Sequence, residues 1–264
     1  MADPVAALLA DPANALLALD FDGTLAPIVA RPQDARPAVG ALQVLIQLAD
    51  RLGQVAVISG RAAADVVRLG GLEQVPRLQV LGHYGMESWR DGRLDSPDPD
   101  PGVTQARRRL PTLLTYAPDG VYVEDKTHSV AVHTRPAANP QQALDDLTPA
   151  LWELAAATNL EAVQGKYVLE LRPSGIDKGT ALRGLVADAW ARVVIYVGDD
   201  VGDLPAFRVV SALRETGEVE GLAVAAIVPD APDVPGELRD AADLVLPGPD
   251  GVVAWLAGIA AMLP

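Results

Sequence analysis

The sequence contains no cysteine. This absence excludes disulfide bonds, a thiolate nucleophile and a zinc site built on cysteine. Basic residues are also scarce, because 21 Lys and Arg stand against 35 Asp and Glu and give a formal net charge of −14. Such an excess of negative charge argues against nucleic acid or an anionic membrane surface as a partner. It would also repel a phosphorylated substrate, so a site for one must supply a local cation.

Long apolar runs are missing as well. The amino terminus shows no basic region followed by a long apolar stretch, and the apolar segment 252–263 is too short to cross a bilayer. We therefore expect a cytoplasmic protein without a membrane partner, whose acidic surface favours a soluble monomer. Half of the 264 residues are hydrophobic, which is enough to bury a core in one large domain or two modest ones.

Short apolar runs alternate with helical patterns along most of the chain. The predicted strands are 15–19, 54–58, 78–81, 192–197, 223–228 and 242–246. The predicted helices are 39–52, 62–69, 178–191 and a last one from residue 250. This alternation predicts an α/β fold with a doubly wound parallel sheet.

The pattern changes between residues 103 and 172. Polar and apolar residues alternate at 121–126 and 129–134, which predicts an antiparallel hairpin with one wet face. Helices at 103–115 and 141–157 and a second hairpin at 160–171 complete the segment. We interpret residues 103–172 as an inserted α+β cap domain, with residues 1–102 and 173–264 forming the core.

Polar residues gather where the predicted strands of the core end or its helices begin. Asp20 and Asp22 follow the buried strand 15–19, at the sheet edge where α/β proteins bind ligands. Two carboxylates in that position must be paired, bound to metal or shifted in pKa. The other members of this set are Ser59, Lys178, Asp199, Asp200 and Asp203.

Each of these residues also has an ordinary structural explanation. Ser59 could cap the next helix, and Asp199 and Asp200 could be helix-capping acids. Lys178 could be a surface lysine, but a cation at a helix amino terminus opposes the helix dipole and therefore indicates a nearby anion. As a group, the carboxylates suit Mg²⁺, while the lysine and the serine hydroxyl suit phosphoryl oxygens. Phosphoryl transfer through an aspartyl-phosphate requires such a set.

Four segments resemble, in this order, the four motifs of the haloacid dehalogenase superfamily of phosphohydrolases. They are DFDGT, the serine of SGR, the lysine that opens a later helix, and GDDVGD. The resemblance implies that Asp20 is the nucleophile and a metal ligand. It implies that Asp22 is the general acid and base and ligates the metal through its backbone carbonyl. Mg²⁺ and Lys178 are then expected to lower the pKa of Asp20 by opposite charge.

The same resemblance assigns the remaining motif residues. Ser59, in the segment with Gly60, would bind the phosphoryl group together with Lys178. Asp199 would ligate Mg²⁺, and Asp200 and Asp203 would complete or support its ligand shell.

Longer segments narrow the resemblance to one family. Seven segments resemble the trehalose-6-phosphate phosphatase family along nearly the full chain. They are LDFDGTLAPI, ISGR, GHYGME, VEDKTHSVAVHTR, GKYVLELRP, DKGTAL and GDDVGDLPAF. The resemblance implies Mg²⁺-dependent hydrolysis of trehalose 6-phosphate to trehalose and phosphate, the final step of trehalose biosynthesis. It implies that the sugar is bound by Glu124, Lys126 and Glu170 of the cap, with Arg61 and His83 contributing from the core.

Other interpretations stay open at this point. Without the resemblance, Glu124, Lys126 and Glu170 could be a solvated sheet face with cross-strand ion pairs. His133 is expected to be structural, and His128 to lie exposed in a turn. The enzyme could instead act on sucrose 6-phosphate or a mannosyl phosphoglycerate, or be a phosphomannomutase, and the chain could be a non-catalytic sugar-phosphate sensor. Residues 91–102 and 171–175 are the expected hinges for closure of the cap.

Overall fold

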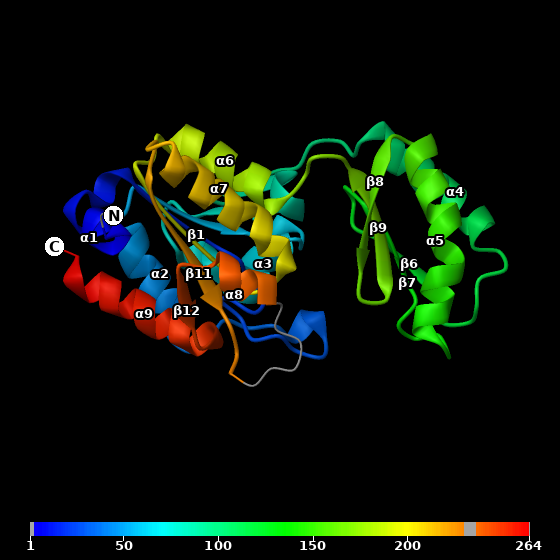
Figure 1. Cartoon of the computed structure of the whole chain (residues 1–264), viewed down its shortest axis with the longest axis horizontal. Coiled ribbons are helices and arrows are strands. Elements are labelled where there is room, and N and C mark those ends of the chain that lie inside the picture. Colours follow the sequence, from blue (N-terminus) through cyan, green and yellow to red (C-terminus); the bar gives the residue numbers. More distant parts are fainter. Residues whose placement is uncertain (1–2, 230–235, 264) are drawn as a thin grey trace. The chain divides into compact units, whose positions relative to one another are not determined.

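Figure 1 shows the computed structural model of the chain, which describes residues 3–229 and 236–263. The chain divides into two compact units. The core unit comprises Met1–Ser96 and Asp177–Pro264, and the inserted unit is Pro97–Ile176. The helix expected from residue 103 begins at Pro101, because the side chain of Asp100 accepts the N–H of Gly102 and caps the helix there.

The core unit is built on a sheet of order β12-β11-β10-β1-β2-β3-β4-β5. Its strands are β1 (Ala15–Leu19), β2 (Gln54–Ile58), β3 (Gln79–Gly82), β4 (Glu87–Arg90), β5 (Arg93–Asp95), β10 (Val193–Gly198), β11 (Glu220–Ala226) and β12 (Leu244–Leu246). The strands from β12 to β3 pair in parallel, as the sequence predicted. All five residues of β1 are buried, which places the start of the first motif in the middle of the sheet.

An antiparallel hairpin of β4 and β5 forms one edge of this sheet and was not anticipated. Asp91 and Gly92, with φ values of 49° and 79°, make the two-residue turn between its strands. Asp-Gly is a strong signal for such a turn. Residues 91–95 therefore belong to regular structure, and the irregular connection to the inserted unit begins at Ser96.

Helices cover both faces of the core sheet, because residues of β1 alternate between two apolar clusters. Leu17 and Leu19 pack in the cluster with α1 (Pro4–Ala10), α2 (Ala41–Ala49), α3 (Ala63–Gly70) and α9 (Gly248–Met262). Leu16 and Ala18 pack in the cluster with α6 (Lys178–Ala189), α7 (Leu204–Glu215) and α8 (Gly236–Ala241). Figure 1 shows α6 and α7 on one side of the sheet and α2 and α9 on the other. This is the predicted doubly wound arrangement.

The inserted unit is an antiparallel sheet of order β6-β7-β9-β8 packed against two helices. Its elements are α4 (Pro101–Leu113), β6 (Tyr122–Asp125), β7 (Val130–His133), α5 (Pro140–Ala157), β8 (Leu160–Gly165) and β9 (Val168–Pro173). Both predicted hairpins are confirmed. Short 3₁₀ turns include η2 (Pro32–Asp34), η4 (His83–Gly85) and η5 (Val201–Asp203). None of the helices described in either unit is long and apolar enough to cross a membrane.

Candidate active site

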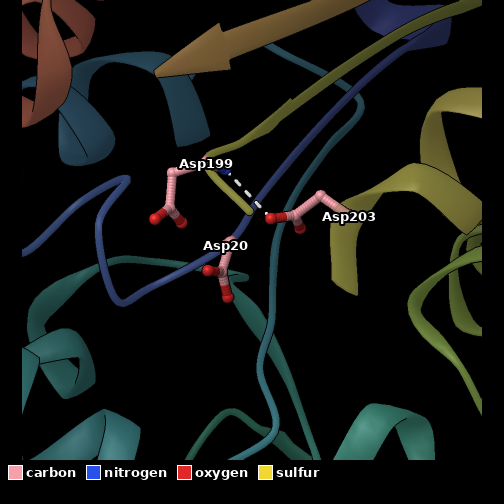
Figure 2. Close-up of side chains that lie close together, drawn as sticks. All are labelled: Asp20, Asp199 and Asp203. Atoms are coloured by element: carbon pink, nitrogen blue, oxygen red, sulfur yellow. Dashed lines mark hydrogen bonds between the residues drawn. The ribbon is translucent and has the colours of Figure 1, made fainter. Parts of the chain in front are cut away.

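The centre of the site is the carboxyl end of β1 (Figure 2). The chain leaves the strand at Asp20, whose N–H donates to the carbonyl of Val197 in β10 at 2.9 Å. The segment then closes on itself, because the N–H of Ala26 donates to the carbonyl of Phe21 at 2.8 Å. Asp20 is 5% exposed, whereas the side chain of Asp22 is 34% exposed. The two aspartates of the motif therefore lie in different environments.

Lys178 compensates part of the buried negative charge. It is the first residue of α6, and the helix starts where the side chain of Asp177 accepts the N–H of Thr180. Its Nζ lies 2.9 Å from Oδ1 of Asp20 and 2.8 Å from Oδ1 of Asp203. All three of these side chains are buried. The anion inferred next to Lys178 is thus, in part, a pair of carboxylates of the protein itself.

Asp203 organises the loop that follows β10. Its Oδ1 accepts hydrogen bonds from Nζ of Lys178 and from the hydroxyl of Tyr196, the latter at 2.6 Å. Its Oδ2 accepts the backbone N–H groups of Asp199 (2.9 Å) and Asp200 (3.1 Å). Each oxygen of Asp203 therefore already has two donors, which favours a supporting role over metal ligation.

Asp199 and Asp200 are adjacent in sequence but differ in their contacts. Asp199 lies over the turn of the first motif, where Oγ1 of Thr24 donates to its Oδ1 at 3.4 Å. A Cβ on Gly23 would stand 1.9 Å from Oδ2 of Asp199, and Gly23 has a φ of +80°, so only glycine fits there. Asp200 is exposed and accepts the N–H of Gly202 at 2.8 Å, as the capping residue of η5.

Burial raises the pKa of Asp20, Asp199 and Asp200. The pKa of Asp20 is raised to about 7, because burial and the charge of Asp203 outweigh the attraction of Lys178. Burial and repulsion by Asp20 raise the pKa of Asp199 to about 9. Although burial acts in the same direction on Asp203, Lys178 and the hydrogen bonds hold its pKa below the usual value. The expected lowering of the pKa of Asp20 therefore cannot come from Lys178 alone.

The residues present fit a divalent cation. Asp20, Asp199 and Asp203 each offer a carboxylate oxygen, and these oxygens lie within 4.8 Å of one another. Figure 2 shows the three side chains converging from the ends of β1 and β10 and from the turn after β10. A cation would compensate the negative charge of Asp20 and Asp199, whose pKa values are raised in its absence. Because the oxygens of Asp203 are already occupied, Asp20 and Asp199 are the carboxylates best placed to hold it.

Asp22 forms an ion pair with Arg61, a residue that we had expected on the sugar. Nε and Nη2 of Arg61 each lie 2.6 Å from one oxygen of Asp22, which is a bidentate geometry. Nη1 of Arg61 donates to the carbonyl of Pro32 at 2.9 Å, and the guanidinium carbon lies 6.0 Å from the ring centroid of Phe21. Arg61 therefore joins the first motif, the loop that follows it and its own SGR segment.

Ser59 and Gly60 lie in the loop between β2 and α3. Ser59 is 2% exposed, and its hydroxyl oxygen accepts the N–H of Arg61 at 3.2 Å. The N-cap of α3 is Ala62, so the helix-capping explanation of Ser59 is wrong. The serine instead shapes the loop between the strand and the helix.

His83 follows β3 and its backbone is hydrogen-bonded to this loop. Its side chain is 6% exposed, and its Nε2 is 3.9 Å from Oε2 of Glu87. The N–H of His83 donates to the carbonyl of Arg61 at 2.9 Å, and the N–H of Tyr84 donates to the carbonyl of Ser59 at 3.0 Å. These backbone bonds fix the loop from the segment of His83, and the contact of its imidazole with a sugar stays a prediction.

Glu124, Lys126 and Glu170 lie on one face of the sheet in the inserted unit. The register places Glu124 opposite Ala131, and Ala131 opposite Glu170 on the next strand. Nζ of Lys126 lies 3.4 Å from Oε2 of Glu170 and 4.0 Å from Oε2 of Glu124. The sequence thus predicted which side chains come together, and the cross-strand ion pairing considered as the alternative is also present.

The two histidines of the first hairpin lie in different surroundings. His133, expected to be structural, lies on the same face as Glu124, with its Nε2 2.7 Å from Oε2 of Glu124. Its ring stacks on Tyr122 with a centroid distance of 4.8 Å and an interplanar angle of 8°. Alternation along β7 is the signal that could have placed it there. His128 was expected to be exposed but is 2% exposed, and its N–H donates to the carbonyl of Lys126 within the turn.

The family model and the curated relatives that match this chain indicate the same family. A family model described as Trehalose-phosphatase matches residues 18–229. The trehalose-phosphate phosphatase of Mycobacterium avium is 37% identical over 216 residues, which are 78% of this chain and 52% of that protein. That of Mycobacterium tuberculosis is 35% identical over 238 residues, 84% of this chain and 59% of that protein. The chain spans about half the length of these curated relatives.

Solved structures share the fold at low sequence identity. Trehalose-6-phosphate phosphatase from Aspergillus fumigatus matches with a TM-score of 0.69 and 23% identity over 98% of this chain and 96% of that chain. The C-terminal domain of the enzyme from C. albicans matches with a TM-score of 0.76 and 20% identity, with the same two coverages. A haloacid dehalogenase-like hydrolase from Bacteroides thetaiotaomicron has a TM-score of 0.68 and 16% identity over 93% of this chain and 99% of that chain. The predicted fold class is confirmed.

Proposed function

The chain belongs to the trehalose-phosphatase family, and on this premise we propose that it hydrolyses trehalose 6-phosphate to trehalose and inorganic phosphate. The reaction would be the final step of trehalose biosynthesis. One observation carries the proposal: Asp20, Lys178 and Asp199, which come from three separate motifs, meet in one cluster in which Asp20 and Lys178 are buried and Asp199 is half-buried. We propose Mg²⁺ as the cofactor, with Asp20 and Asp199 as its carboxylate ligands.

In the proposed mechanism, a carboxylate oxygen of Asp20 attacks phosphorus while the bond from phosphorus to the sugar oxygen breaks. Asp22 gives its proton to the departing sugar oxygen, which leaves as a hydroxyl group. Asp22 then takes a proton from water, whose oxygen attacks phosphorus and frees Asp20 together with inorganic phosphate. When bound, Mg²⁺ would supply positive charge that stabilises the transferred phosphoryl group.

The other residues would bind and orient the reactants. Lys178 and the loop of Ser59 and Gly60 would hold phosphoryl oxygens. We assign Arg61 the role of orienting Asp22 in its ionised form, the form that takes a proton from water, because its bidentate pair occupies both carboxylate oxygens. One of these two contacts must open when Asp22 carries the proton for the sugar oxygen. A supporting role for Asp203 follows from its four donors, which position Lys178 and the backbone of the loop after β10.

We further propose that Glu124, Lys126 and Glu170 recognise the hydroxyl groups of the disaccharide. Charged groups in a row across three strands can make several charge-assisted hydrogen bonds to a neutral polyol. His133 and Tyr122 extend this row on the same face. The inserted unit would then determine which sugar phosphate is accepted.

Release of phosphate from a panel of sugar phosphates, with and without Mg²⁺, tests the proposal. We expect Mg²⁺-dependent turnover that strongly favours trehalose 6-phosphate over sucrose 6-phosphate and mannosyl phosphoglycerate. Equal rates on unrelated sugars would remove the assignment of trehalose. Phosphate exchange between two hydroxyls of one sugar would indicate a mutase. A shift of the melting temperature without any turnover would indicate a sensor.

A further inference from the structure

Glu87 is a buried carboxylate that lies outside the acidic cluster. It begins β4, and its side chain is 7% exposed. Its Oε2 accepts the backbone N–H of Ala63 at 2.8 Å, and its Oε1 accepts the hydroxyl of Ser96 at 3.0 Å. A buried charge is tolerated only where partners compensate it, so these partners indicate what the residue holds in place.

The bond to Ala63 starts α3 from outside the helix. Ala62, the N-cap, has no side-chain acceptor for the free N–H groups of the first turn. Glu87 supplies that acceptor from the neighbouring hairpin, and its negative charge complements the helix dipole. The two segments touch closely, because a Cβ on Gly82 would stand 2.2 Å from the backbone nitrogen of Ala63.

The start of α3 is also the end of the loop that holds Ser59 and Arg61. Two carbonyls of this loop accept N–H groups from His83 and Tyr84, in the segment that leads to Glu87. The loop is therefore fixed along its length by residues 82–87. Through this loop, Glu87 helps to position the hydroxyl of Ser59, which is assigned to phosphoryl binding, and the guanidinium of Arg61, which orients the general acid.

The second oxygen of Glu87 reaches the end of the first part of the core unit. Ser96 is the last residue of that part, and the inserted unit starts at the next residue, Pro97. One carboxylate thus contacts both the end of the loop and the point where the chain departs for the inserted unit.

We propose that Glu87 is a positioning residue, which fixes the Ser59–Arg61 loop and links it to the connection at Ser96. This inference rests on the proposed function, because the loop matters only if it binds a phosphoryl group. Glu87 acts through the backbone of the loop and touches no substrate. Its loss should weaken phosphate binding without changing the affinity for the cation, whose carboxylate ligands follow other strands.

The test compares E87Q, E87D, E87A and S96A with the full-length wild-type protein. The matched control is E73Q, which changes an exposed acid in the turn after α3. For each protein, calorimetry gives the dissociation constant of inorganic phosphate at saturating Mg²⁺. Steady-state kinetics give kcat, KM for trehalose 6-phosphate and the Mg²⁺ concentration for half-maximal rate.

E87Q is expected to stay within about threefold of the wild type, because a glutamine can accept from Ala63 N–H and donate to Ser96 Oγ. E87A should raise the phosphate dissociation constant about tenfold and leave the Mg²⁺ requirement unchanged. E87D, which is one methylene shorter and cannot reach both partners, should fold and weaken phosphate binding about threefold. S96A should keep the affinity for phosphate but raise KM about threefold, because only the link to the connection is lost.

Wild-type phosphate affinity in E87A, or in E87D where E87A does not fold, would overturn the positioning role. An unchanged KM in S96A would overturn the link to Ser96. An equal loss of phosphate and Mg²⁺ affinity would also contradict the proposal, because general destabilisation affects both. Failure of the wild type to release phosphate from any sugar phosphate is a separate result, which would overturn the proposed function instead.

Discussion

In each of the two units, acids gather around a lysine, and the two clusters differ in their access to water. In the core unit, the side chains of Asp20 and Lys178 are 7% and 6% exposed, and burial raises the pKa of the acid. In the inserted unit, Lys126 and Glu124 are 23% and 47% exposed. The first cluster carries charge that the protein does not fully compensate, which suits a cation and a phosphoryl group. The second is compensated by its own pairs and by water, which suits a neutral ligand that forms hydrogen bonds.

The largest expected effect comes from the nucleophile of the buried cluster. D20N should lower kcat by about 10³-fold or more, because the amide cannot form the covalent intermediate. D145N, in an exposed acid of α5, serves as the control and should leave kcat unchanged. Phosphate release at saturating substrate gives the measurement, and near-normal turnover of D20N would exclude the covalent mechanism.

The second prediction concerns the uncompensated charge itself. The pKa values of Asp20 and Asp199 are raised from 3.8 to about 7 and about 9, so the fold binds protons that the unfolded chain releases. Metal-free stability should therefore fall as the pH rises from about 4 to about 9. A bound cation replaces those protons, so the stabilisation by Mg²⁺ should grow over the same range.

Thermal unfolding from pH 5 to pH 9, with Mg²⁺ or with a chelator, measures both slopes. D199N serves as the matched variant, because it removes the carboxyl group with the higher pKa. It should flatten the metal-free slope and abolish most of the Mg²⁺ effect. A metal-free melting temperature that rises with pH would contradict the account of the cluster.

A third prediction concerns the partly exposed pair at the edge of the buried cluster. R61K breaks the bidentate contact with Asp22 and should lower the rate on trehalose 6-phosphate about tenfold. With p-nitrophenyl phosphate, whose leaving group departs without a proton, the loss should stay within about threefold. Equal losses on both substrates would show that Arg61 binds the phosphoryl group rather than orienting Asp22.

The smallest effects are expected on the exposed face. K126M should raise KM for trehalose 6-phosphate about fivefold, and H133Q about twofold, because both contacts are partly open to water. Inhibition by inorganic phosphate should not change, since phosphate lacks the sugar. If either variant weakened phosphate inhibition as much as substrate binding, the assignment of this face to the sugar would be wrong.

The sequence predicted the fold well where local pattern decides it. The bounds of β1 and β2 agree with the predicted 15–19 and 54–58, because short runs buried on both faces end sharply at polar residues or glycine. The helix α1 was missed, although Asp3-Pro4 is a typical helix start. The hairpin of β4 and β5 was missed despite its Asp-Gly turn.

The sequence revealed the identity of the site residues more readily than their partners. Arg61 and Asp22 are 39 positions apart, and only the fold brings them together. Tyr196 has the pattern of a core residue, so its bond to Asp203 could not be anticipated. Burial raises the pKa of Asp20 and Lys178 lowers it. Which effect is larger depends on distances in the fold, and the sequence does not give these distances. The extent of the cap domain and the roles of its residues stay predictions.

The division of the core unit by the insertion has a consequence for how the chain is made. Asp20 and Ser59 precede Pro97–Ile176, whereas Lys178 and Asp199 follow it. A ribosome therefore completes the whole inserted unit before it makes the lysine or the strand β10 that flanks β1. Until then, β1 lacks one of its two neighbours and Asp20 lacks its counterion, so the first half of the core should remain unfolded during synthesis. The inserted unit, which has its own apolar core, is the part that can fold first.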